Sequence, residues 1–166
     1  MSLTNKARGK YLENKITSSY REIFNLNEFE CYRAGSSGAR TSIEYNGDIS
    51  FSNPGKYPLI TECKYYSKMI LNDFFPTCNS YVEKWLAQIN IEKEHYIKKF
   101  DIIPLTIITA SKPHGKIHII IENIDYAPNQ TIPYIKFKSE KQNRFYYIID
   151  CDYIIELFKL FKLLDD

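Results

Sequence analysis

Three charged residues stand in a segment that otherwise has the pattern of two hydrophobic strands: Asp48, Glu62 fourteen residues later, and Lys64 two residues after that. Residues two apart in a strand share a face, so Glu62 and Lys64 point the same way and Cys63 points to the opposite side. If Asp48 lies on a neighbouring strand, it brings a second carboxylate close to Glu62. Two such carboxylates repel each other unless a cation lies between them. The spacing therefore predicts a site for Mg²⁺ or Mn²⁺, which both take oxygen ligands.

A divalent cation beside a lysine is suited to phosphodiester hydrolysis. The cation polarises a phosphoryl oxygen and helps to deprotonate a water molecule, while Lys64 positions that water or stabilises the charge of the transition state. The pattern is short and also occurs by chance. The alternative interpretation is a hairpin whose charges face water and form Glu62 to Lys64 surface pairs.

Residues nearer the N-terminus add suitable chemistry. Glu13 follows Leu12 at the edge of an apolar helical stripe, where it would face the sheet and reach a metal directly or through water, although most helical glutamates are simply solvated. A glycine- and serine-rich loop and two basic clusters offer hydroxyl and guanidinium donors to phosphate oxygens, although solvated surface charge is the commoner explanation for such clusters. The residues predicted to contact DNA are Arg8, Lys10, Arg33, Ser36, Ser37 and Arg40.

Composition restricts the class of protein. The chain has 166 residues, 44% hydrophobic and 25% charged, which is typical of one globular domain over residues 1–166. Its net charge is only +2, so a DNA-binding surface must be a local basic patch rather than a property of the whole chain.

The cysteines and the hydropathy pattern indicate a cytoplasmic protein. Cys31, Cys63, Cys78 and Cys151 form no CxxC pair and no signal peptide precedes them, which predicts free thiols in a reducing compartment and argues against a zinc site. No apolar run approaches the roughly 18 residues of a membrane span, so we expect a soluble protein without a membrane partner.

Hydrophobic periodicity predicts the elements that must hold these residues. An amphipathic helix is expected from Thr4, its N-cap, to about Leu26. Strands are expected at "FECYR", at 48–52 and at 57–66, the last two as an antiparallel hairpin, with a mobile loop at "AGSSGARTS".

The second half of the chain is also expected to contain both helices and strands. A long helix is expected after Pro76, capped by Asn79 or Ser80, and then strands at "IPLTIITA", "KIHIIIENI" and "RFYYIID". A helix over 152–164 is expected to end the chain. This order predicts an α/β fold, a mixed central sheet flanked by helices.

These residues together resemble the PD-(D/E)xK nuclease superfamily. Asp48, Glu62 and Lys64 match its motif, with Gly47 where a proline is common. "ARGKYLENKI" resembles the RGxxxE helix of Holliday junction resolvases, and "YRAGSSG", "GDI" and "TECK" resemble the strand, serine loop and catalytic hairpin of the archaeal type. "QINIEKEHYIKKFDIIPLTIITA" and "CDYIIELF" are similar to segments of the bacterial penicillin-binding-protein-related factor A resolvases.

The resemblance implies a restriction-endonuclease-like core and a Mg²⁺-dependent endonuclease that acts on four-way DNA junctions. It assigns catalysis to Glu13, Asp48, Glu62 and Lys64, a further metal contact to the carbonyl of Cys63, and positioning of the scissile strand to Ser36 or Ser37. It also implies a homodimer with two active sites, since paired symmetric cuts need paired symmetric sites.

Several alternatives stay open. Glu44 competes with Asp48 as the first metal ligand, although fourteen residues to Glu62 suit a hairpin better than eighteen. Gln88 could bind substrate or be an ordinary exposed helix residue, and Trp85 is interpreted as core rather than as a base-stacking platform. The rival functions are a sequence-specific restriction-type or repair nuclease acting on duplex DNA, and a non-catalytic DNA-binding module.

Overall fold

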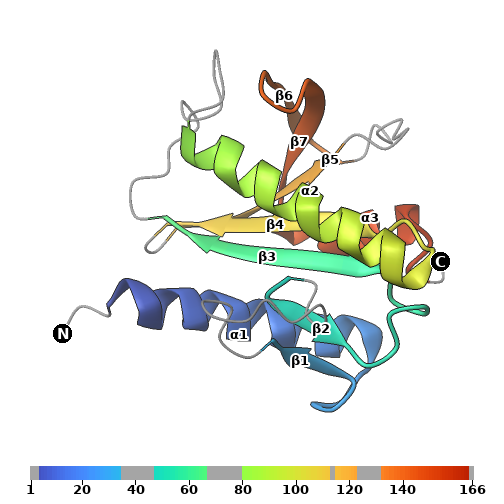
Figure 1. Ribbon diagram of the computed structural model, residues 1–166. Helices are drawn as coiled ribbons and strands as arrows, with labels where there is room; N and C mark the ends of the chain where they lie inside the picture. The colour runs from blue at the N-terminus through green and yellow to red at the C-terminus, as the bar shows by residue number, and fades with distance from the viewer. Residues whose placement is uncertain (1–3, 35–46, 67–79, 113–114, 123–131, 165–166) are drawn as a thin grey trace.

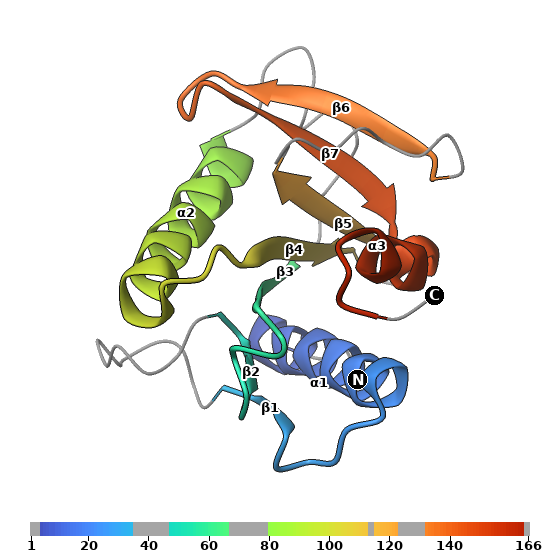
Figure 2. The same ribbon diagram turned by 90° about the vertical axis from the view of Figure 1, so that its right-hand side faces the viewer.

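A seven-stranded mixed sheet runs through the molecule, with the strand order β1-β2-β3-β4-β5-β7-β6. The computed structural model describes residues 4–34, 47–66, 80–112, 115–122 and 132–164. Helix α2 covers one face of the sheet, and α1 and α3 pack on the other (Figures 1 and 2). The predicted α/β class, a mixed central sheet flanked by helices as in a restriction-endonuclease-like core, is confirmed.

The strands pair in a pattern that explains the mixed sheet. β1 (Cys31–Arg33), β2 (Ile49–Phe51) and β3 (Leu59–Tyr65) are antiparallel neighbours. β3 and β4 (Leu105–Ser111) run parallel, and α2 (Ser80–Phe100) makes the crossover that parallel strands require. β5 (Ile117–Glu122), β7 (Arg144–Asp150) and β6 (Tyr134–Ser139) complete the sheet with antiparallel pairs.

The first helix agrees with its prediction. α1 spans Asn5–Phe24, and the Thr4 side chain accepts a hydrogen bond from the backbone N–H of Ala7 at 3.3 Å. The helix ends where Asn25 adopts a left-handed conformation, which is a common C-terminal cap. Its buried stripe, at four-residue steps, is Leu12, Ile16, Tyr20 and Phe24.

The other predicted elements are present, with two corrections. The predicted hairpin forms, with Ile49 opposite Thr61. The predicted loop over 34–42 lies outside the described residues except for Ala34. The strand β6 was not predicted: it is the last strand of the sheet, and only Phe137 and Ser139 of its six residues are buried. The signal was an alternation of lysines with buried residues, which is common in edge strands.

The C-terminal helix is shorter than the predicted 152–164. A 3₁₀ turn at Cys151–Tyr153 leads into α3, which spans only Ile154–Leu160. Lys162 has a φ of 55°, and the N–H of Leu163 donates to the carbonyl of Phe158 at 2.8 Å, so the chain turns back. Leu163 and Leu164 continue the apolar sequence pattern but pack against the core outside the helix.

Two further expectations concern cysteines and membranes. Cys31, Cys63 and Cys151 are free thiols, and Cys78 lies outside the described residues. None of the described helices has the length and apolar character needed to cross a bilayer.

The docking of α3 on the sheet predicts a mutational effect. Phe158 is fully buried, with its ring centre 5.5 Å from that of Tyr20 and 5.0 Å from that of Phe24. We expect Phe158→Ala to lower the free energy of unfolding by about 3–5 kcal/mol, because it removes apolar contacts and leaves a cavity. Ile155→Ala is the control on the same helix, since Ile155 is 46% exposed. Equal urea midpoints for the two variants would contradict this packing.

Candidate active site

The central strand β3 carries Glu62 and Lys64 on the face that α2 covers, because alternate residues of a strand share a face and Ile60 belongs to the core beneath α2. Cys63, between them, is buried in the core beneath α1. The predicted separation of the charged residues from Cys63 is therefore confirmed.

Gly47 fixes the approach of Asp48 to this strand. Its φ is +87°, and a Cβ atom added there would lie 2.6 Å from the carbonyl oxygen of Thr61. Proline holds φ near −65°, so it does not fit this backbone, and any other side chain would collide with β3. The departure from the family motif at this position thus has a structural cause, the close contact between Gly47 and Thr61.

Asp48 is anchored to β3 by two hydrogen bonds. Its N–H donates to the carbonyl of Thr61 at 2.8 Å, and its Oδ2 accepts from the N–H of Cys63 at 2.8 Å. The residue is only 7% exposed. Burial, then the charges of Glu62 and Glu13, raise the pKa of Asp48 to about 6, although the bond from Cys63 and the charge of Lys64 act in the other direction.

Glu62 is buried still more deeply, at 2% exposure. Its Oε2 accepts from Lys64 Nζ at 2.5 Å and from Gln88 Nε2 at 2.8 Å. Burial, opposed by the charge of Lys64 and reinforced by the carboxyl group of Glu92, raises the pKa of Glu62 to about 7. The Glu62 to Lys64 contact is therefore not the surface pair of the alternative interpretation.

Helix α2 contributes two residues to the same cluster. Gln88 accepts from Lys64 Nζ at 2.9 Å and donates to Glu92 Oε1 at 3.1 Å, in addition to its bond with Glu62. Glu92 Oε2 is buried and has no hydrogen-bond partner in the described part of the chain. Gln88 was a candidate from the sequence, whereas Glu92 was missed; its four-residue spacing from Gln88, which places both on one helix face, was the available signal.

The predicted Glu13 lies beside the cluster. Its Oε2 accepts from the guanidinium of Arg33 at 3.0 Å, and its charge contributes to the raised pKa of Asp48. Gly9, one turn earlier, lies next to this carboxylate, since an added Cβ would make an ordinary contact of 3.9 Å with Glu13 Oε1. Glu13, the last residue of the RGxxxE pattern, therefore lies near Arg33 and Asp48.

The remaining predicted residues fall into two groups. The Arg8 guanidinium lies 5.9 Å from the ring centre of Tyr65, and Lys10 is exposed on α1. The residues outside the described part of the chain are Ser36, Ser37, Arg40 and Glu44, so the choice between Glu44 and Asp48 stays a prediction. The carbonyl of Cys63 likewise stays a predicted ligand.

The side chains of the cluster carry the kind of oxygen ligand that a divalent cation takes, although their present placement does not form a metal site. Asp48, Glu62 and Glu92 supply hard oxygen atoms, and the unpartnered oxygen of Glu92 is a buried acceptor that a cation would satisfy. As they stand, no three acidic, histidine or cysteine side chains of the described residues are placed to hold a metal ion. In this arrangement Lys64 and Gln88 occupy the Glu62 oxygen, and the N–H of Cys63 occupies an Asp48 oxygen.

Comparison with known proteins gives one match. The model of a family described as "Phage putative PDDEXK endonuclease" matches residues 4–164. No curated protein and no solved structure matches the chain. The family match covers the whole cluster, including the helical residues Glu13, Gln88 and Glu92.

The contact at Gly47 predicts the effect of a single added methyl group. We expect Gly47→Ala to lower the free energy of unfolding by about 1–3 kcal/mol, because alanine is strained at positive φ and its Cβ meets the Thr61 carbonyl. Gly55→Ala is the matched control, since its Cβ would meet only Asn53 Oδ1 at 3.6 Å. Urea unfolding measures the free energy of unfolding of each variant. A Gly47→Ala variant as stable as the natural chain would refute the close approach of Gly47 to Thr61.

The buried carboxyl groups predict how the metal-free protein responds to pH. The pKa values of Asp48 and Glu62 rise from 3.8 and 4.5 to about 6 and about 7, so the folded chain binds these protons more tightly than the unfolded chain. The free energy of unfolding must then fall as the pH rises from about 4 to about 7, between the unfolded and folded pKa values. In chelator, we expect a lower melting temperature at pH 7.5 than at pH 5.5.

The control for this pH effect is a pair of neutralising variants. Glu62→Gln removes one of the buried titrating groups and should shrink the difference between the two melting temperatures. Glu94→Gln changes an exposed residue of α2 and should leave it unchanged. The interpretation is wrong if both variants lose the same stability between the two pH values as the natural chain.

Proposed function

The chain belongs to the PDDEXK endonuclease family, and from that premise we propose that it is a metal-dependent, structure-selective DNA endonuclease that cleaves four-way junctions. The observation that carries the proposal is the cluster of the buried Asp48 and Glu62 with the half-buried Lys64, joined to α2 through Gln88. Buried carboxylates with raised pKa values beside a lysine are expected at catalytic sites rather than on inert surfaces.

Asp48, Glu62 and Glu92 are the residues that would hold the cation, with Mg²⁺ as the proposed ion and Mn²⁺ as a substitute. When bound, such a cation supplies electrophilic activation of the scissile phosphate and lowers the pKa of water. Its positive charge would also keep the carboxyl groups ionised at neutral pH, which their burial opposes.

Lys64 and Gln88 have positioning and charge-stabilising roles in this proposal. The ammonium of Lys64 is held by both Glu62 and Gln88, so its three N–H donors have a fixed orientation. A water molecule or a phosphate oxygen beside Nζ would accept a hydrogen bond from the remaining N–H group of the ammonium. The ammonium would then stabilise the negative charge that develops on the phosphate during attack.

Selectivity for junctions rests on the resemblance to resolvases. Glu13, the glutamate of the RGxxxE pattern, affects the pKa of Asp48, which supports a role for α1 at the same site. A homodimer would present two such sites to a four-way junction and would allow paired symmetric cuts. The alternative is a restriction-type or repair nuclease that cleaves linear duplex DNA at this same cluster.

A cleavage assay tests the proposal. The purified chain is incubated with a synthetic four-way junction, a linear duplex of the same sequence and a single strand, with Mg²⁺, Mn²⁺ or chelator. We expect paired nicks in the junction that require the metal, and a loss of at least about 100-fold in rate for Asp48→Asn and Lys64→Ala, as for removal of other charge-stabilising groups.

The matched control pair is Glu92→Gln and Glu94→Gln, two glutamates of α2 of which only the first reaches the cluster. Glu92→Gln should slow cleavage and Glu94→Gln should not. Cleavage of the linear duplex with no preference for the junction would favour the restriction-type alternative. Binding without cleavage in every metal would leave the non-catalytic DNA-binding module.

A further inference from the structure

Three aromatic rings gather immediately beyond Lys64. Tyr66 follows β3 and is held to the sheet by the bond from its N–H to the carbonyl of Ser111 at 3.0 Å. Its ring centre lies 5.3 Å from that of Tyr81 and 6.0 Å from that of Trp85, both in the first turns of α2. We refer to Tyr66, Tyr81 and Trp85 as the aromatic cluster.

The aromatic cluster and the catalytic residues lie along the same two elements. Glu62, Lys64 and Tyr66 are two residues apart, so they follow one face of β3 and its extension. On α2, the spacing of Tyr81, Trp85, Gln88 and Glu92 is four, three and four residues, which forms one continuous stripe. At 1.5 Å per residue, Tyr81 lies about 10 Å along the helix from Gln88.

This distance of about 10 Å equals the length of roughly three nucleotides of one duplex strand. Successive nucleotides of one duplex strand advance about 3.4 Å along the axis, and an extended strand needs fewer nucleotides to cover the same distance. A strand whose phosphate lies at Lys64 would therefore place a base within one to three nucleotides at the aromatic cluster. Lys84, whose Nζ lies 5.8 Å from the ring centre of Tyr81, adds an exposed positive charge for the backbone.

The cluster is also accessible. Tyr81 is 52% exposed, while Tyr66 and Trp85 are half-buried and support it from the side of the core. Aromatic side chains beside a lysine bind bases by stacking, and every base has a face that can stack. In a duplex these faces are covered by the neighbouring base pairs, so only an unpaired or extruded base can reach the ring.

We propose that the aromatic cluster binds an unpaired nucleotide next to the cleaved bond, and that the substrate of the site is DNA with unpaired bases at that position. This inference rests on the proposed nuclease function and narrows its substrate class. A branch point with open bases, a flap or a single strand would be bound, whereas a continuous duplex would lack the base that the cluster stacks upon.

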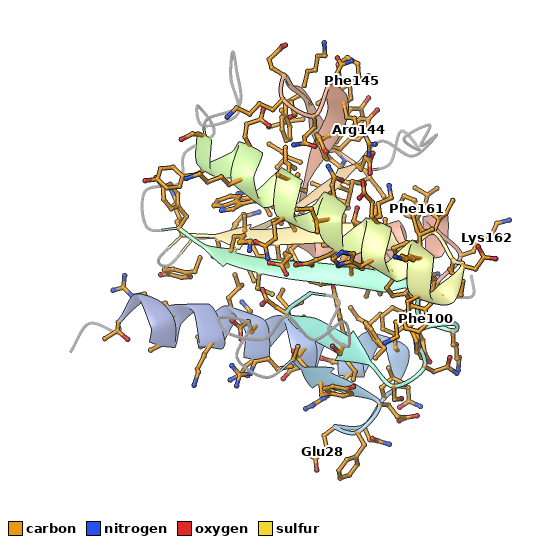
Figure 3. The ribbon with its side chains drawn as sticks, viewed as in Figure 1. Glu28, Phe100, Arg144, Phe145, Phe161 and Lys162 are labelled. Carbon is orange, nitrogen blue, oxygen red and sulfur yellow. The ribbon has the colours of Figure 1, made fainter. Side chains whose placement is uncertain are left out.

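A second aromatic residue with a lysine partner provides a matched control. Lys136 Nζ lies 4.3 Å from the ring centre of Phe145, which is 44% exposed. Figure 3 shows Arg144 and Phe145 at the end of the molecule opposite Glu28, at the tip of the β6–β7 hairpin. Phe145 is likewise an exposed ring beside a lysine, but it lies on the sheet face opposite α2, because its neighbour Tyr146 packs in the core beneath α2.

The test measures binding in chelator, so that cleavage does not enter. Fluorescence anisotropy gives the affinity of the full chain for a duplex with a three-nucleotide unpaired flap, for the same flap made of abasic sites, and for the continuous duplex. We expect Tyr81→Ala to weaken binding of the normal flap about 5- to 100-fold, which is the usual effect of losing one stacked base. Tyr81→Phe and Phe145→Ala should bind as the natural chain does.

Trp85, the single tryptophan of the chain, gives a second readout. Its fluorescence should change when the normal flap binds and should change less with the abasic flap, because the abasic flap keeps the phosphates and lacks the bases. The proposal is overturned if the normal and abasic flaps bind equally well, or if Tyr81→Ala and Phe145→Ala have equal effects. Stacking without cleavage of any DNA would instead refute the nuclease function and leave the binding site.

Discussion

The burial of Asp48 and Glu62 is the constraint on which the rest of the site depends. Two carboxyl groups at 7% and 2% exposure lose most of their hydration, and charged groups placed so close together repel each other. The chain offsets this cost with the N–H of Cys63, the ammonium of Lys64 and the amide of Gln88. These donors neutralise the cluster only in part, as the raised pKa values show. The buried Oε2 of Glu92 is left without a hydrogen-bond donor among the described residues.

The fold holds the hydrogen-bond donors of the cluster in place because β3 is paired along both edges and packed on both faces. β2 and β4 pair with its two edges, the core beneath α1 holds Cys63, and the core beneath α2 holds Ile60. The hydroxyl of Thr109 on β4 also donates to the sulfur of Cys63 at 3.2 Å. A shift of β3 by one residue would exchange its two faces and bury Lys64 in the α1 core. The geometry of the site is therefore set by the register of the sheet.

The predictable part of this site is the part that depends on local periodicity. Glu62 and Lys64 follow from the two-residue period of a strand, and Leu12 and Glu13 follow from the stripe of α1. Glu92 lies thirty residues after Glu62 and is brought to it by the packing of α2, so the sequence offered only its four-residue spacing from Gln88 as a signal. The strand β6 was missed because its exposed residues hide the alternation, and the end of α3 was misplaced because Leu163 and Leu164 are apolar for tertiary reasons. In each case contacts distant in sequence outweighed the local pattern.

A contact between residues distant in sequence, Gly47 and Thr61, also accounts for glycine at a position where the PD-(D/E)xK motif commonly has proline. The Asp48 carboxylate lies beside β3 because Gly47, at a positive φ, packs directly against the Thr61 carbonyl. That close approach allows the Asp48 N–H to bond to Thr61 and its carboxylate to bond to Cys63, two residues further along the same strand. Proline would remove the approach and the position of the acid with it. The glycine at this position therefore goes with a fixed placement of the Asp48 carboxylate beside β3.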